Sequence, residues 1–179
     1  MKNITIILVL GLILGIIGIS GCISSGSSTN STFSDGSISF DYPSDFTNAT
    51  PGSLISGDKS WVDVKYLANS DGTAIYVQKN LKINDPSNAR QITDSKNKGD
   101  VSTGEILSHT TDTNPNGITV YKSINTLKNP DDGEVLKYID LYFKDNKGVV
   151  YAISIYDTES NYQTVSDTAD VIFNSLSLK

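Results

Sequence analysis

The sequence has one cysteine, one histidine and one arginine among its 179 residues. A single cysteine, Cys22, excludes a disulfide framework, so the folded part depends on its apolar core. A single histidine, His109, excludes a metal site built from several imidazoles. Basic residues are scarce as well: 14 Lys and Arg stand against 20 Asp and Glu, a net charge of −6. No nucleic-acid partner is expected, because phosphate binding requires clustered Lys and Arg.

The N-terminus carries the one long apolar run, over residues 4–19. One lysine precedes the run, and segment 19–22 reads Ile-Ser-Gly-Cys. A basic start, an apolar stretch and a small-residue end are the layout of a signal peptide. The last four residues resemble the lipobox of bacterial and archaeal lipoproteins. That resemblance implies that the thiol of Cys22 receives a lipid and that cleavage leaves this cysteine first.

The alternative is a signal anchor that stays uncleaved, because the run approaches the roughly 20 residues that span a bilayer. Gly11 and Gly15 even form a GxxxG pair, which can mark a helix-dimer face. The run is short and glycine-rich, which favours cleavage. With either alternative the remainder of the chain is expected at the outer face of the cell membrane.

Three regions follow from this layout: a signal peptide over residues 1–21, a tether over 22–34 and one domain over 35–179. Residues 22–34 begin with the lipidated cysteine and are rich in Ser, Gly and Thr, with too little apolar surface to fold. The last region is long enough for one sizeable core. Asn30 and Asn48 each start an N-glycosylation triplet, and are candidate acceptors in an archaeal or eukaryotic host.

Alternating apolar and polar residues dominate the last region. Strands are predicted over residues 37–42, 61–67, 73–79, 105–111, 118–127, 134–143 and 149–156. Turn-rich segments at 69–72, 114–117 and 145–148 join these strands into hairpins. The sequence therefore predicts an antiparallel sheet of about six or seven strands.

Two helices are expected beside the sheet. The first covers residues 86–98, with Pro86 in its first turn and Gly99 near its end. The second is capped by Asp157 or Thr158. Its apolar residues recur at helical spacing: Tyr162, Val165, Ala169, Ile172, Phe173 and Leu176. Strands 134–143 and 149–156 are apolar on both sides, which is typical of strands covered twice. We therefore expect an α+β fold with helices on both faces of the sheet.

Three segments resemble the PsbP-like proteins. They are residues 40–46 (FDYPSDF), 148–154 (GVVYAIS) and 172–176 (IFNSL). The resemblance extends over about residues 33–179 and implies an antiparallel sheet sandwiched by helices. This group includes photosystem-associated extrinsic subunits and DcrB-like bacterial lipoproteins. The matched positions are core and turn residues, so no catalytic or binding residue is carried over, and fold alone does not establish function.

One polar string matches the opening of a calcium loop. Residues 112–117 follow the pattern D-x-N-x-N-G, which makes Asp112, Asn114 and Asn116 candidate ligands. The twelfth position is Ser123 instead of the bidentate Glu of an EF-hand. A hairpin turn is the favoured interpretation. No other cofactor is expected.

The remaining candidates are aromatic. Trp61, Tyr66 and Tyr76 lie on neighbouring predicted strands and would form a binding patch if exposed, although strand tyrosines usually pack under a helix. His109, alone in a strand and without a Gly-x-Ser-x-Gly elbow, is interpreted as structural. We expect a membrane-anchored, non-catalytic binding or assembly module for an envelope protein or complex. The alternative is a small-ligand receptor or hydrolase with a site between sheet and helix.

Overall fold

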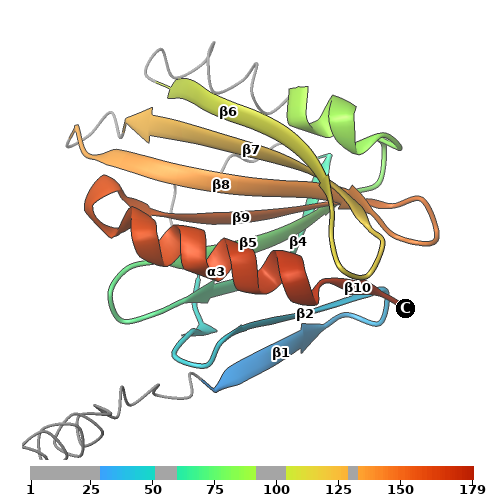
Figure 1. Ribbon diagram of the computed structural model, residues 1–179, viewed down its shortest axis with the longest axis horizontal. Coiled ribbons are helices and arrows are strands. Elements are labelled where there is room, and N and C mark those ends of the chain that lie inside the picture. The colour runs from blue at the N-terminus through green and yellow to red at the C-terminus, as the bar shows by residue number, and fades with distance from the viewer. Residues whose placement is uncertain (1–28, 51–59, 92–103, 129–132) are drawn as a thin grey trace, which may run out of the picture.

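The computed structural model describes residues 29–50, 60–91, 104–128 and 133–179 (Figure 1). Within these residues the main sheet has seven strands: β3 (Thr47–Asn48), β4 (Trp61–Ala68), β5 (Ala74–Asn80), β6 (Gly104–Thr113), β7 (Thr119–Lys128), β8 (Val135–Lys144) and β9 (Val150–Thr158). Their order is β3-β4-β5-β9-β8-β7-β6, and all neighbours are antiparallel. The predicted antiparallel sheet is therefore confirmed.

Three hairpins of this sheet are closed by the same kind of turn. The first residues of the three turns are Asn69, Asn114 and Asp145. In each case its side-chain Oδ1 accepts hydrogen bonds from the backbone N–H groups two and four positions later. Glycine with positive φ occupies the fourth position, where a side chain would be strained. The turns predicted at 69–72, 114–117 and 145–148 are thus present, and Asn and Asp act through their oxygens.

A second, smaller sheet corrects two expectations. It consists of β1 (Asn30–Ser34), β2 (Ile38–Pro43) and β10 (Ser177–Leu178), in the order β1-β2-β10. The strand predicted at 37–42 belongs to this sheet and not to the main one. The expected tether also ends earlier than residue 34, because all of β1 pairs with β2. The ring centroid of the buried Phe33 lies 5.0 Å from that of Phe40, which explains why this segment is ordered.

The helix α3 (Tyr162–Ser175) lies across one face of the main sheet and contacts β8, β9 and β2 (Figure 1). Val165, Ala169 and Ile172 are buried, which confirms the helical spacing read from the sequence. The predicted cap is wrong. The strand β9 continues through Thr158, and a 3-10 turn, η1 (Glu159–Asn161), precedes the helix. The Asp157 carboxylate is buried and binds the Thr73 hydroxyl across the sheet instead of capping α3.

The main core lies between α3, the main sheet and β2. Its largest fully buried side chains include Phe40, Phe143, Tyr151, Ile153 and Ile172. Burial of about 25 cal/mol per Å² of apolar surface makes this layer the chief source of stability. No helix among the described residues is long and apolar enough to span a membrane.

The opposite face of the main sheet has a different composition. Residues 86–91 are helical there, and the buried Ala89 packs with Tyr142, Val150 and Ala152. The rest of the helix predicted over 86–98 lies outside the described residues. The α+β class is supported, but a helical layer on both faces is not confirmed, because much of this second face is formed by tyrosines and polar side chains.

Candidate functional site

Four tyrosines from four strands share the sheet face opposite α3, and we call this group the tyrosine face. Its members are Tyr66 on β4, Tyr76 on β5, Tyr138 on β8 and Tyr156 on β9. Cross-strand register pairs Tyr66 with Tyr76 and Tyr138 with Tyr156. The latter two rings stack at 4.7 Å between centroids, and the former two meet edge to face at 5.7 Å. Such pairs add to the stability that ring burial provides.

Hydrogen bonds connect the two pairs and extend them to a carboxylate. The hydroxyl oxygens of Tyr66 and Tyr156 lie 2.9 Å apart. The Tyr76 hydroxyl donates to the carboxylate of Asp63, which also accepts a bond of 3.0 Å from Gln78 Nε2. Contacts within the sheet therefore hold the rings in fixed positions.

The pKa values of these hydroxyls are displaced upward. Burial is the largest cause for Tyr76, Tyr138 and Tyr156, and it raises each pKa above the ordinary value of 10. The hydrogen bond to Asp63 raises the pKa of Tyr76 further, and that to Tyr66 raises the pKa of Tyr156. At neutral pH these groups are uncharged, so they offer hydrogen bonds and ring surface.

The predicted patch of Trp61, Tyr66 and Tyr76 is brought together only in part. Tyr66 and Tyr76 are neighbours, whereas Trp61 packs at the far end of the same face against the cluster around Tyr142. The patch predicted from the sequence does not include Tyr138 and Tyr156. The hairpin turn at 145–148 carried the signal, because it sets the register that places these two opposite each other. Tyr76 is 4% exposed, and the other three tyrosines are partly exposed.

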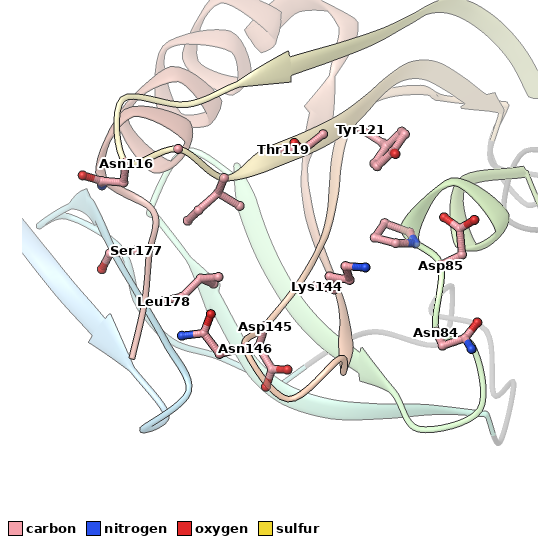
Figure 2. Close-up of a pocket in the computed structure, with 13 residues that line it drawn as sticks. Asn84, Asp85, Asn116, Thr119, Tyr121, Lys144, Asp145, Asn146, Ser177 and Leu178 are labelled. Carbon is pink, nitrogen blue, oxygen red and sulfur yellow. The ribbon is translucent and has the colours of Figure 1, made fainter.

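A concave feature lies at one end of the main sheet, and we call it the polar groove (Figure 2). Its volume is about 1090 Å³. Four segments form it: residues 84–86, 116–119, 144–146 and 177–178, together with Tyr121. Figure 2 shows Lys144 extending from the end of β8 toward the segment that carries Asp85. Segments far apart in the sequence therefore converge on one polar site.

Two of the three candidate calcium residues, Asn114 and Asn116, hold the end of α3. Asn114 is 3% exposed, and its Nδ2 donates to the carbonyl oxygens of Phe173 and Leu176 at 3.0 and 2.7 Å. The Nδ2 of Asn116 donates to the Leu176 carbonyl at 2.9 Å. Asp112 is exposed on β6. Over the described ranges no group of three or more His, Cys, Asp or Glu side chains could hold a metal ion.

Cross-strand register aligns His109 with Ser123, and Ser123 with Asp140. These are the residue types of a hydrolytic triad, but a triad needs the histidine between the serine and the acid. Here the serine lies in the middle, and it is fully buried. We therefore assign no catalytic role to this row.

Two sequence candidates concern modification. Asn30 is the first residue of β1, and Asn48 is the last residue of β3; both are exposed. Cys22, the predicted lipidation site, lies outside the described residues. These candidates remain predictions from the sequence.

Comparisons with known proteins concern the fold. No protein-family model matches the chain, and no curated protein matches it. LpqN of Mycobacterium tuberculosis, involved in cell envelope biogenesis, aligns at 14% identity with a TM-score of 0.54, over 84% of this chain and 91% of LpqN. The Ran-binding protein Mog1p of Saccharomyces cerevisiae aligns at 13% identity with a TM-score of 0.55, over 85% of this chain and 96% of Mog1p.

LpqN and Mog1p share a fold with PsbP-like proteins, so the likeness supports the fold part of that resemblance. At these identities the likeness carries the fold alone.

Proposed function

We propose that this protein is a non-catalytic binding or assembly module of the cell envelope, held at the outer face of the membrane through Cys22. The observation that carries the proposal is the tyrosine face. Tyrosine is enriched where proteins bind proteins, because a rigid ring offers a large contact area and its hydroxyl can donate or accept. Three of the four tyrosine residues are partly exposed.

Pre-ordering of the rings favours binding. Immobilising a side chain on association costs about 0.5–1.5 kcal/mol. Stacking of Tyr138 on Tyr156 and the hydroxyl contact of Tyr66 with Tyr156 already restrict these rings. A partner that docks on this face therefore loses less of its binding energy to ordering.

Charge indicates the kind of partner. Asp63 is exposed beside the tyrosine face, and the chain is acidic overall. Tyrosines elsewhere in the molecule already receive cations: Lys137 Nζ lies 3.9 Å from the ring centroid of Tyr162, and the Arg90 guanidinium lies 5.5 Å from that of Tyr121. A partner segment with exposed Lys or Arg complements this surface.

The envelope location is supported by two observations. The N-terminal layout and the Ile-Ser-Gly-Cys segment are typical of an exported lipoprotein. The fold is that of LpqN, a protein of cell envelope biogenesis.

Co-purification tests the binding role. The full-length protein is extracted from membranes in mild detergent, and Tyr66→Ala is compared with Tyr162→Ala, which removes a part-buried tyrosine at the start of α3. We expect a stoichiometric partner with the parent protein, about tenfold less with Tyr66→Ala, as for a loss of about 1.4 kcal/mol, and full recovery with Tyr162→Ala. Equal recovery with both variants, each shown to be folded by circular dichroism, would contradict the tyrosine face as the binding surface.

Replacing the single thiol tests the anchor. Cys22→Ser is expected to release the protein from membranes or to leave the precursor unprocessed, since lipid transfer needs the thiol. Fractionation and intact mass report the result. Unchanged size together with unchanged membrane retention would indicate the uncleaved helix instead.

A small-ligand receptor is the second candidate function, and the polar groove is the observation that favours it. The groove lies at one end of the main sheet, and Pro86 at the start of the helical segment 86–91 also lines it. Its size and lining residues suit a polar ligand.

A further inference from the structure

The polar groove contains three exposed side chains that make no side-chain hydrogen bond within the described residues. Asn84, Thr119 and Lys144 are exposed in the groove, and within the described ranges none of them makes a side-chain hydrogen bond or ion pair. An amide, a hydroxyl and an ammonium group supply several donors, and the first two accept as well.

Two further side chains use only one of their two polar atoms in the hydrogen bonds of the described chain. Asn116 and Asn146 each donate through Nδ2 to a backbone carbonyl, at 2.9 Å to Leu176 and 3.2 Å to Lys179. These bonds fix the two amides and leave their Oδ1 atoms as acceptors at the groove. The groove therefore presents donors and acceptors side by side.

Two acidic residues, Asp85 and Asp145, and one basic residue, Lys144, line the groove. Hydrogen bonds from Ser87 and the positive charge of Lys144 lower the pKa of Asp85, so this carboxyl group is charged at neutral pH. The other acid, Asp145, is 6% exposed and accepts the backbone N–H groups of Lys147 and Val149. An anionic ligand would need an excess of positive charge, and phosphate in particular would need Arg or several Lys. The groove lacks that excess.

We infer that the polar groove binds a neutral, hydroxyl-rich ligand, a glycan segment of a few sugar units. Each sugar hydroxyl both donates and accepts, which matches the mixture that Asn84, Thr119, Lys144 and the amide oxygens provide. The volume of about 1090 Å³ is at the upper end for small-molecule sites, so it accommodates more than one ring. Tyr121 and Leu178 add apolar surface for the C–H groups of a sugar.

The place of the groove indicates the source of the glycan, and this step rests on the proposed anchor at Cys22. Asn30 is the first residue of β1, which follows the tether, and it pairs with Pro43 at one end of β2. The groove residues Ser177 and Leu178 pair with the other end of β2, about 17 Å away at 3.4 Å per residue. The groove therefore lies away from the attachment point, which favours envelope glycans beyond the bilayer over glycolipid head groups within it.

Saturation-transfer NMR with the full-length protein, in a detergent without a sugar head group, tests the inference. The probes are maltotriose and triacetylchitotriose. Asn84→Ala combined with Thr119→Val removes two groove side chains, and Thr164→Val combined with Asn174→Ala is the matched control on exposed positions of α3. We expect transfer to at least one probe, about tenfold weaker affinity for the groove variant, and no change for the control.

Absence of transfer to both probes, or equal affinity of the two variants, would overturn the inference. Binding only to vesicles that contain a digalactosyl lipid would overturn the assignment to a free glycan. The outcome is separable from the proposed partner binding, because the groove variant leaves Tyr66 unchanged and is expected to recover the protein partner in full.

Discussion

Single side chains connect parts of the fold that are far apart in the sequence, and Asn114 is the clearest case. It belongs to the turn between β6 and β7, yet its amide donates to carbonyls 59 and 62 positions away, at the end of α3. Its Oδ1 accepts two backbone N–H groups of its own turn. One buried side chain thus satisfies both a hairpin and a helix end, where carbonyls lack partners within the helix.

Replacing this residue should therefore destabilise the protein strongly. Asn114→Ala leaves buried carbonyl and N–H groups without partners, and we expect a loss of about 2–4 kcal/mol in the free energy of unfolding, measured by urea denaturation. Asn116→Ala removes one exposed donor to Leu176, and about 1 kcal/mol or less is expected. Similar losses for the two variants would contradict the central role of Asn114.

Asp35, at the turn between β1 and β2, is expected to contribute to the response to acid. Burial raises the pKa of its carboxyl, but hydrogen bonds from Ile38 N, Ser37 N and the Tyr151 hydroxyl outweigh this, and the net pKa lies below the ordinary 3.8. The stabilisation is therefore complete above pH 3.8 and is lost as the pH falls through the lower folded value.

Asp35→Asn should consequently differ from the parent protein most above about pH 4. Toward pH 2 the difference in urea midpoint is expected to shrink. Tyr151→Phe removes one of the three hydrogen bonds and should reproduce part of the effect. A constant difference from pH 2 to pH 6 would show that the charge on Asp35 is not the cause.

At the scale of elements, the two faces of the main sheet differ in how they are filled. The side of the sheet under α3 is packed mainly with aliphatic and phenylalanine side chains. The opposite side includes the tyrosine face and the buried polar residues Asn125 and Asp140. Asn125 Nδ2 donates to Asp140 at 2.9 Å. A helical layer needs an apolar surface to pack on, and this composition is suited to polar contacts instead.

The tyrosines also predict a response to alkali. Burial raises the pKa of Tyr151 to about 12 and those of Tyr76, Tyr138 and Tyr156 above the ordinary 10. Because the folded pKa exceeds the unfolded one, the stabilisation is complete below pH 10 and is lost as the pH rises through the folded values.

We therefore expect the ultraviolet absorbance of tyrosinate to rise in two stages. In the first stage only some of the nine tyrosines ionise. The second stage coincides with the loss of circular dichroism. Tyr156→Phe should reduce the amplitude of the second stage. A single titration near pH 10 with the fold intact would contradict the protection of these hydroxyls.

At the scale of the whole molecule, the small sheet joins the start of the folded chain to its end. β2 pairs with β1 on one side and with β10 on the other, and Lys179 N donates to Ser37 O at 2.9 Å. The domain boundary expected at residue 35 therefore cuts through a structural unit.

A chain that starts at Asp35 should be less stable than one that starts at Thr29. It lacks β1 and the buried ring of Phe33, and a loss of about 3 kcal/mol or more is expected from the cost of removing a buried phenylalanine. Thermal unfolding of both chains measures it, with Phe33→Ala in the longer chain as the control. Equal melting temperatures would restore the boundary at residue 35.

The local features were the ones that could be predicted. Strand alternation, the three Asx-Gly turns and the apolar stripe of α3 depend on neighbours within about ten positions, and each was recovered with small errors at the ends. The sequence predicts a tether where β1 lies, because the five residues of this strand are mostly polar and only Phe33 is buried. The two-residue strands β3 and β10 are too short for any periodicity.

The sequence by itself determined the antiparallel class and the position of the long helix, because these depend on local pattern and composition. The exported layout that centres on Cys22 stays a prediction from the sequence. Only the tertiary structure decided that Tyr66 meets Tyr156, that Asn114 holds the end of α3, and that residues 84–86 and 177–178 share a groove. These contacts join residues 62 to 94 positions apart, and their geometry is set by sheet order and packing, which no local pattern encodes.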